Sequence, residues 1–520
     1  MEDLWSWLTT LPEPSQWPSA PPSLVLAASA DAKSIRLSAD RTAGSDAEPL
    51  LTFSFSLHGF HLSSTSRTLW LSNPVPSASP HLPLLLQLLR ECIPMSPSSF
   101  SFSAPKLDQG TLSSALVRDE GQAAPFLCLA LLLRLFWLCA TDAPAEAGFL
   151  FFSALDAPLE RALCCRLALR GVLLAVGPDV EECFMRSLGY MLSKWCLFRQ
   201  LQGSAAKRLL PAGFCPSYAA DRHGLWVLKG FAPLPAMGRV GASSATGPGL
   251  EATDSALRYA LAHQQLEAVV QLEYTVCTRD PRFIRVSVRV DNIRLRVVGL
   301  RYGRSKDDET GGQEDDLEGE RHFPSRARVW VGPELGTPYA TGPSLGRSSG
   351  NPERQIEATR TVKGRFGSGK AAGIKAAART ATRLQGRSWR WEQEAEGSAG
   401  VFEGVLCDHA TGTEVAAWRP EEGGGGNPRA GMRRRYSGWG RAFSKAGGVV
   451  VAGDELAEAV EWRVGREMEG RVVMWRVGGR VWVSYFANEV KTGYFETRSV
   501  EWREEVELAL VAGTSELTAR

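Results

Sequence analysis

The sequence lacks the cysteine patterns of a secreted or zinc-binding scaffold. Its ten cysteines include no C-x-x-C pair, and seven of them lie between Cys92 and Cys196, in apolar segments such as FLCLALLLRLFWLCA. A zinc site or a disulfide framework requires clustered, regularly spaced ligands. We therefore expect buried, reduced thiols in a protein of the cytoplasm or the nucleus.

Long hydrophobic runs and a basic N-terminal region are also missing. The first residues, MEDLWSWLTTLPEP, carry Glu2 and Asp3, which argues against a secretory signal. The most apolar run, 126–140, has fifteen residues and contains Arg134. A helix that spans a bilayer needs about 20 apolar residues. We predict a buried core helix at 126–140 and no transmembrane segment.

The chain has almost no overall charge of either sign. It carries 59 basic and 57 acidic residues, for a net charge of +2, which excludes a globally basic nucleic-acid-binding protein. The charge is unevenly distributed, because residues 1–200 have a net charge of −4 and residues 201–520 a net charge of +6. A charged functional site is therefore expected to be local.

Three short motifs lack the context that their chemistry needs. Residues 364–371 resemble a P-loop, but Ala371 replaces the Ser or Thr that would hold Mg²⁺. Residues 342–346, GPSLG, match the nucleophile-elbow pattern, but the proline and the residues that follow do not fit a turn from strand to helix. His58 and His61 have no nearby third ligand. We therefore predict no catalytic residue, cofactor or metal site.

The first half of the chain predicts a mainly helical module with a few early strands. Short apolar runs separated by Pro, Ser and Asp predict strands, and Leu- and Ala-rich runs with few breakers predict helices. The predicted strands lie at 23–29, 34–40 and 50–62, and the predicted helices at 82–92, 126–140, 159–176 and 179–201.

The second half alternates apolar and polar residues as strands do. We predict an α+β protein, with an α-rich N-terminal module followed by an antiparallel, β-sandwich-like C-terminal half packed by tryptophans. The boundaries are an N-terminal module at 1–210, a connecting segment at 211–265 and a β-rich module at 266–520. Irregular insertions are predicted at 303–327 and 419–431, and a basic segment lies at 360–390.

Two hairpins are predicted within the β-rich half. The alternation of apolar residues changes parity at Asp291-Asn292, which a two-residue turn within 284–298 explains. Gly478-Gly479 separates two strand-like runs within 472–485, and a Gly-Gly pair favours a tight turn.

The basic segment is the most unusual feature of the charge distribution. Nine basic and no acidic residues lie between Arg360 and Arg390. The alanine-rich core of the segment predicts a helix, on which four bases spaced by four residues, from Lys375 to Arg387, form a stripe. Like charges at this spacing repel, so an anionic counterpart is expected. The candidate anion-binding residues are Lys363, Arg365, Lys370, Lys375, Arg379, Arg383, Arg387 and Arg390.

Three alternatives remain open for the basic segment. It is a solvated face, or the acidic segment 307–320 neutralises it internally, or it meets an external partner. The external partners that fit are an acidic protein, an anionic lipid and a nucleic acid.

Two long stretches carry a family resemblance. RVWVGPELGTPYATGPSLGRSSGNPERQIEATRTVKGRFG, followed by SWRWEQEAEGSAGVFEGVLCDHATGTEVAAW, is similar to a land-plant protein family of unknown function, over most of the chain. The resemblance implies a plant source. It implies no fold, activity or functional residue.

These observations favour a binding function over catalysis. We expect a non-enzymatic binding or scaffold protein that contacts an anionic partner through the basic segment. The alternative is an enzyme of unrecognised type, with a cleft between the two halves.

Overall fold

The structure is a computed structural model that describes most of the chain. The described residues are 4–11, 21–42, 49–60, 66–77, 80–95, 107–116, 120–201, 215–235, 263–299, 322–334, 336–346, 354–366, 374–386, 389–407, 414, 448–452, 459–486 and 495–511. They divide into two compact units. Unit 1 comprises 1–219, 229–267 and 298–318, and unit 2 comprises 220–228, 268–297 and 319–520.

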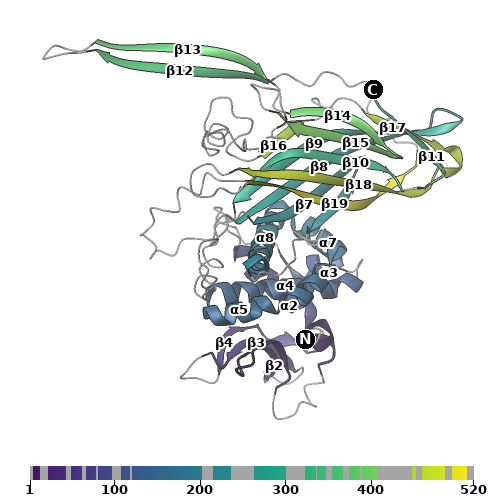
Figure 1. The fold of residues 1–520 in the computed structure, drawn as a ribbon. Coiled ribbons are helices and arrows are strands. Elements are labelled where there is room, and N and C mark those ends of the chain that lie inside the picture. The colour runs from purple at the N-terminus through teal and green to yellow at the C-terminus, as the bar shows by residue number, and fades with distance from the viewer. Residues whose placement is uncertain are drawn as a thin grey trace. The chain divides into compact units, whose positions relative to one another are not determined.

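Unit 1 combines a small antiparallel sheet with a group of helices (Figure 1). The sheet has the order β1-β2-β3-β4, and β5 pairs with β3. Its strands are β1 (Ser23–Ala28), β2 (Ser34–Thr42), β3 (Leu50–His58), β4 (Ser66–Leu71) and β5 (Val75–Pro76). The early strands predicted from the sequence are thus present.

The helices of unit 1 cover the sheet and contain most of its apolar core. They are α1 (Leu4–Thr9), α2 (His81–Cys92), α3 (Gln109–Leu116), α4 (Glu120–Thr141), α5 (Ala145–Ser153), α6 (Asp156–Ala162), α7 (Arg166–Val176) and α8 (Pro178–Leu201), with a 3₁₀ turn at Ile93–Met95. The rings of Phe55 in β3 and Phe151 in α5 are in edge-to-face contact at 6.4 Å. Helix and sheet therefore share one core.

Helix α4 contains the long apolar run of the sequence. Among the described residues it is the one helix whose length and composition would allow it to cross a membrane, from Ala123 to Thr141. In the structure 78% of its most apolar window is buried inside the protein. Arg134 forms an ion pair with Glu91 of α2 at 2.5 Å, which satisfies the charge within the run. Helix α4 is a core helix, as the sequence predicts.

Unit 2 is built from antiparallel strands, some of which begin or end in segments assigned to unit 1. One sheet has the order β11-β17-β9-β8-β7-β6, with β16 paired to β9, and the other has the order β14-β15-β10-β18-β19. The first sheet contains β6 (Ser217–Arg222), β7 (Leu225–Pro235), β8 (His263–Cys277), β9 (Phe283–Gly299), β11 (Ala340–Ser344), β16 (Gly448–Ala452) and β17 (Val460–Gly465). The second contains β10 (Phe323–Pro333), β14 (Trp389–Glu396), β15 (Ala399–Leu406), β18 (Val472–Phe486) and β19 (Phe495–Ala509).

Tryptophans join the two sheets of unit 2. The rings of Trp462 in β17 and Trp475 in β18 are 4.8 Å apart in an edge-to-face contact, and both are buried. The indole of Trp462 also donates a hydrogen bond to the carbonyl oxygen of Ser398, at 2.8 Å. The helical first half and the antiparallel second half confirm the predicted α+β class.

The predicted hairpin at 284–298 is wrong, because these residues lie in the single strand β9. Strand β17 pairs with Phe283–Val288, and β16 pairs with Asn292–Arg296 of the same strand. The parity change is real, since the buried positions are even up to Val290 and odd from Ile293. A β-bulge shifts the alternation of a strand by one residue without reversing its direction.

The predicted hairpin at 472–485 is also wrong, because β18 runs through Gly478 and Gly479 without a turn. A Cβ atom on Gly478 would lie 2.3 Å from the indole of Trp330, and one on Gly479 would lie 2.4 Å from the indole of Trp502. The two glycines make room for rings that pack on opposite faces of the strand. Close packing, and not turn geometry, explains their presence.

The predicted insertions are only partly described. The insertion expected at 303–327 is wrong at its end, since β10 begins at Phe323. The rest of it, including the acidic segment 307–320, and all of 419–431 lie outside the described residues.

Candidate anion-binding site

The basic segment forms two strands and not a helix. Strands β12 (Arg354–Phe366) and β13 (Ile374–Gly386) pair along their whole length in an antiparallel, two-stranded sheet (Figure 1). The four-residue spacing of the bases fits both structures, because positions i and i+4 share a side of a strand as well as of a helix. Threonines in both segments, together with Val362 in β12 and Ile374 in β13, favour a strand. The predicted helix is therefore wrong, and three of the four bases of the predicted stripe, Lys375, Arg379 and Arg383, lie at four-residue spacing in β13.

The register of this hairpin brings bases from both strands into one row. Arg365 lies opposite Lys375, and Lys363 lies opposite Ala377. Every register pair joins two odd-numbered or two even-numbered residues, and alternate residues of a strand face opposite sides of the sheet. We call the odd-numbered pairs the basic row. Its bases are Lys363, Arg365, Lys375, Arg379 and Arg383.

The other three candidate residues do not belong to this row as described. Lys370 and Arg387 lie outside the described residues. Arg390 lies in β14, and its guanidinium is 3.2 Å from the carboxylate of Glu392. The structure thus brings together five of the eight predicted residues.

The basic row carries a large excess of positive charge. Its five bases are accompanied by one acid, Glu357, which lies opposite Arg383. Arg365 and Lys375 are register partners, and like charges at opposite positions destabilise an antiparallel pair. An anion bound along this row would remove that repulsion.

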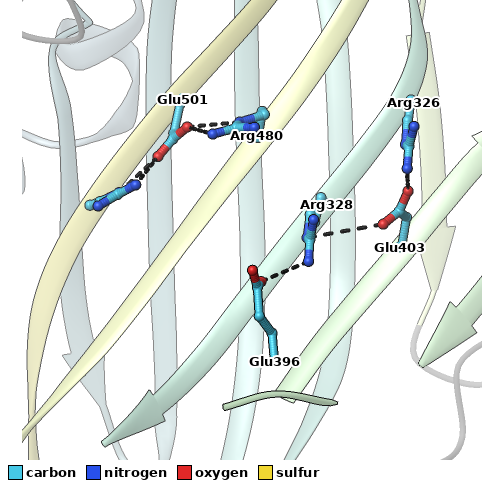
Figure 2. Close-up of polar contacts among 7 residues, drawn as sticks. Arg326, Arg328, Glu396, Glu403, Arg480 and Glu501 are labelled. Carbon is cyan, nitrogen blue, oxygen red and sulfur yellow. Dashed lines mark hydrogen bonds and ion pairs between the residues drawn. The ribbon is translucent and has the colours of Figure 1, made fainter. Parts of the chain in front are cut away.

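A second arginine-rich surface provides a contrast. It lies on the sheet β14-β15-β10-β18-β19, on the face that points away from Trp462 and Trp475. This face carries arginines and glutamates on neighbouring strands (Figure 2). Arg328 lies opposite Glu403 in the register of β10 and β15, and its guanidinium is 2.7 Å from the carboxylate of Glu396. Arg326 forms an ion pair with the nearly buried Glu403. The arginines of β10 are thus neutralised by β14 and β15.

The arginines of β18 and β19 on this face are neutralised in the same way. Glu501 accepts hydrogen bonds from Arg480 and Arg503, with Nε to oxygen distances of 2.7 Å for both. Partial burial acts to raise the pKa of Glu501, but the hydrogen bonds from the two guanidiniums outweigh it and lower that pKa. We refer to this surface as the paired face, because each of its arginines named here has a carboxylate partner.

The ring of Trp482 also contacts two arginines of the paired face. The guanidinium carbons of Arg326 and Arg480 lie 5.0 Å and 5.6 Å from the ring centre of Trp482. Cation–π contacts of this kind contribute about 0.5–1 kcal/mol each at exposed sites. These guanidiniums already have partners within the sheet, so the paired face is a poor candidate for binding an anion.

The remaining motifs do not assemble a reactive site in the described part of the chain. Ser344 is exposed at the end of the edge strand β11 and lies opposite Glu461. The Nε2 atom of His58 is 2.9 Å from the hydroxyl of Ser56. His61 lies outside the described residues. No group of three or more His, Cys, Asp or Glu able to hold a metal ion occurs among the described residues.

Sequence reasoning missed a buried polar cluster on α8. Glu181 accepts a hydrogen bond from Lys229 at 2.7 Å, and Arg186 forms an ion pair with Glu267 at 3.4 Å. Further along the helix, burial lowers the pKa of Lys194 to about 7. Charged residues at helical spacing are typical of a solvated face, so the sequence carried no signal that these are buried.

Comparison with known proteins assigns no family. No family model and no curated protein matches the chain. Solved structures with a remote likeness include the membrane-inserted form of the Clostridium perfringens NetB toxin, at 8% identity, and the Clostridium perfringens delta-toxin, at 9% identity. A third is described as a pore forming protein, at 9% identity. Each covers 56% of this chain, and 95%, 96% and 94% of the other chain respectively, with a TM-score of 0.20. These values are too low to support an argument about fold or function.

Proposed function

We propose that this protein is a non-enzymatic binding protein that contacts an anionic partner through the basic row of β12–β13. The observation that carries the proposal is the register, which aligns five bases with one acid. A base near an anionic surface contributes about 1 kcal/mol to binding, so a net excess of four bases is enough for measurable affinity. The same row without a bound anion has no comparable source of neutralisation within its own register pairs.

We further propose that the protein acts in a reducing compartment, the cytoplasm or the nucleus of a plant cell. The support for the compartment is that all ten cysteines are free and eight of them are buried. Burial raises the pKa of the Cys165 thiol to about 12, which keeps it protonated and unreactive. The plant source rests on the sequence resemblance alone.

The binding proposal is tested with labelled dextran sulfate, a polyanion that has neither the nucleobases of a nucleic acid nor the acyl chains of a lipid. The variant that we call row-neutral carries Arg365→Gln, Lys375→Gln and Arg379→Gln, which lower the net charge of the basic row from +4 to +1. The matched control carries Arg285→Gln, Arg294→Gln and Arg296→Gln, which remove the same charge from exposed positions of β9. Fluorescence anisotropy should show binding by the natural protein and the control, and at least about tenfold weaker binding by the row-neutral variant.

The salt dependence provides a second readout. Binding that neutralises about four anionic groups weakens by roughly 100-fold between about 50 and 200 mM salt. Equal affinities of the row-neutral variant and the control would show that the basic row is a solvated face, and the proposal would then fail.

A further inference from the structure

The even-numbered register pairs of β12–β13 form a row of a different kind. They contain two bases, Arg354 and Arg360, no acid and mostly apolar or small residues. We call them the apolar row. Apart from Arg354–Gly386 at one end, its pairs are Ile356–Leu384, Ala358–Thr382, Arg360–Thr380, Val362–Ala378, Gly364–Ala376 and Phe366–Ile374.

This hairpin therefore has an amphipathic pattern without a sheet to explain it. Strands β12 and β13 pair with each other and with no other described strand. A two-stranded sheet is at best marginally stable alone in water, and an alternating pattern normally means that one face is covered. A partner that meets only the basic row would not account for the apolar row.

We propose that the anionic partner is the surface of a lipid bilayer, and that β12–β13 lies in its headgroup layer with the apolar row toward the acyl chains. This inference rests on the proposed function and names its partner class. An amphipathic segment at a membrane surface sinks its apolar face about 5–10 Å into the boundary between headgroups and acyl chains. The headgroup layer of one leaflet is itself roughly 5–8 Å thick. Bases on the opposite side of the backbone then lie at the level of the phosphates.

The composition of the apolar row favours this shallow position over a hairpin that crosses the bilayer. Arg360 lies opposite Thr380 near the middle of the row. A charged residue on the lipid-facing side is most unfavourable at the bilayer midplane and is tolerated near the interface. The outer edges of a two-stranded sheet would also leave backbone groups without partners in the hydrocarbon, whereas water and headgroups satisfy them at the surface.

The test compares two changes on opposite sides of the same hairpin. The apolar-row variant carries Ile356→Thr, Val362→Thr and Phe366→Thr, which keep the charge and the preference for a strand. The row-neutral variant keeps the apolar row and loses three bases. Both, with the natural protein and the β9 control, are sedimented with vesicles of phosphatidylcholine alone or with about one-third phosphatidylserine, and each is titrated with dextran sulfate.

The membrane inference predicts a distinct pattern across these proteins. The natural protein and the control should bind the anionic vesicles, and should bind neutral vesicles at least about tenfold more weakly. The apolar-row variant should lose at least tenfold in vesicle affinity while its affinity for dextran sulfate is unchanged. The row-neutral variant should lose affinity for both.

Each contrary outcome points to a different error. If the apolar-row variant binds anionic vesicles as the natural protein does, the membrane inference is wrong, while the proposed binding function stands. If neither the natural protein nor the control binds dextran sulfate or anionic vesicles, the proposed function fails as well. If the natural protein releases a dye trapped inside the vesicles, the hairpin crosses the bilayer and the shallow position is wrong.

Discussion

The paired face and the basic row are both rich in arginine, but they differ in how many carboxylates lie beside the arginines. On the paired face, Arg328 and Arg480 lie directly opposite each other, but Glu396 and Glu501 on the outer strands neutralise them. In the basic row, Arg365 and Lys375 also lie opposite each other, and the row holds one acid. The number of arginines is thus a poor guide to anion binding. The carboxylates within reach on the neighbouring strands decide whether the charge of an arginine is available.

The largest effect is expected on the core side of the sheet that carries the paired face, where Gly479 packs against Trp502. Gly479→Val places a branched side chain where a single Cβ atom would already be 2.4 Å from the indole of Trp502. Overpacking of this kind costs about 3 kcal/mol. Denaturant unfolding should show that loss, whereas Gly299→Ala, which meets nothing within 4 Å, should leave the stability nearly unchanged. A fully stable Gly479→Val protein would contradict the continuous strand β18.

A smaller effect should convert part of the paired face into an anion site. Glu403→Gln removes the carboxylate that Arg326 and Arg328 share. We expect a loss of about 1–2 kcal/mol in the free energy of unfolding, because a nearly buried acceptor of charged hydrogen bonds is lost. Two guanidiniums also lose a partner, so binding of dextran sulfate should become stronger. Unchanged stability and unchanged binding would show that these ion pairs do not order the sheet.

The sequence predicts features that depend on neighbouring residues, and it does not predict those that depend on strands distant in the chain. The helices at 82–92 and 126–140 were predictable because they are Leu-rich apolar runs with few breakers, and the helix at 179–201 because its apolar residues recur at helical spacing. Each belongs to the core of unit 1. The paired face was not predictable, since Arg328 and Glu403 are distant in the chain and only strand pairing brings them together. The basic row was found from its charges, while its structure was misread, because a four-residue spacing fits a strand as well as a helix.

The two wrong hairpins have one cause in common. Asp291-Asn292 and Gly478-Gly479 are turn residues by type, but both lie inside long strands. At Gly478-Gly479 the reason is tertiary, namely the rings of Trp330 and Trp502. No local signal distinguishes a glycine that allows a turn from one that admits an indole ring.

In the basic row, one substitution should increase binding. Glu357→Gln removes the row's single acid, opposite Arg383. The net charge of the row rises by one, and we expect about fivefold tighter binding of dextran sulfate at low salt. Anisotropy titrations of this variant beside Glu461→Gln, a change of equal charge in β17, measure the effect. Equal affinities of the two variants would mean that the row does not contact the polyanion.

The smallest effect is expected in the dependence of the protein's stability on acidic pH. The pKa of Glu501 is lowered in the folded protein, so its ion pairs contribute stability above the unfolded-state pKa, and that contribution is lost as the pH falls through the lowered folded-state value. Partly exposed pairs are worth about 0–1 kcal/mol, so the difference will be small. Below about pH 4.5, the stability of Glu501→Gln should depend less on pH than that of the natural protein. A steeper dependence in the variant would contradict the pairing with Arg480 and Arg503.

The central claim is that the basic row of β12–β13, and not the paired face, meets the anionic partner. Hydrogen exchange followed by mass spectrometry tests it directly, with and without saturating dextran sulfate. The account predicts slower exchange in peptides from 354–366 and 374–386, and unchanged exchange in peptides from β10, β18 and β19. Protection that appears in the strands of the paired face while the hairpin is unaffected would contradict it.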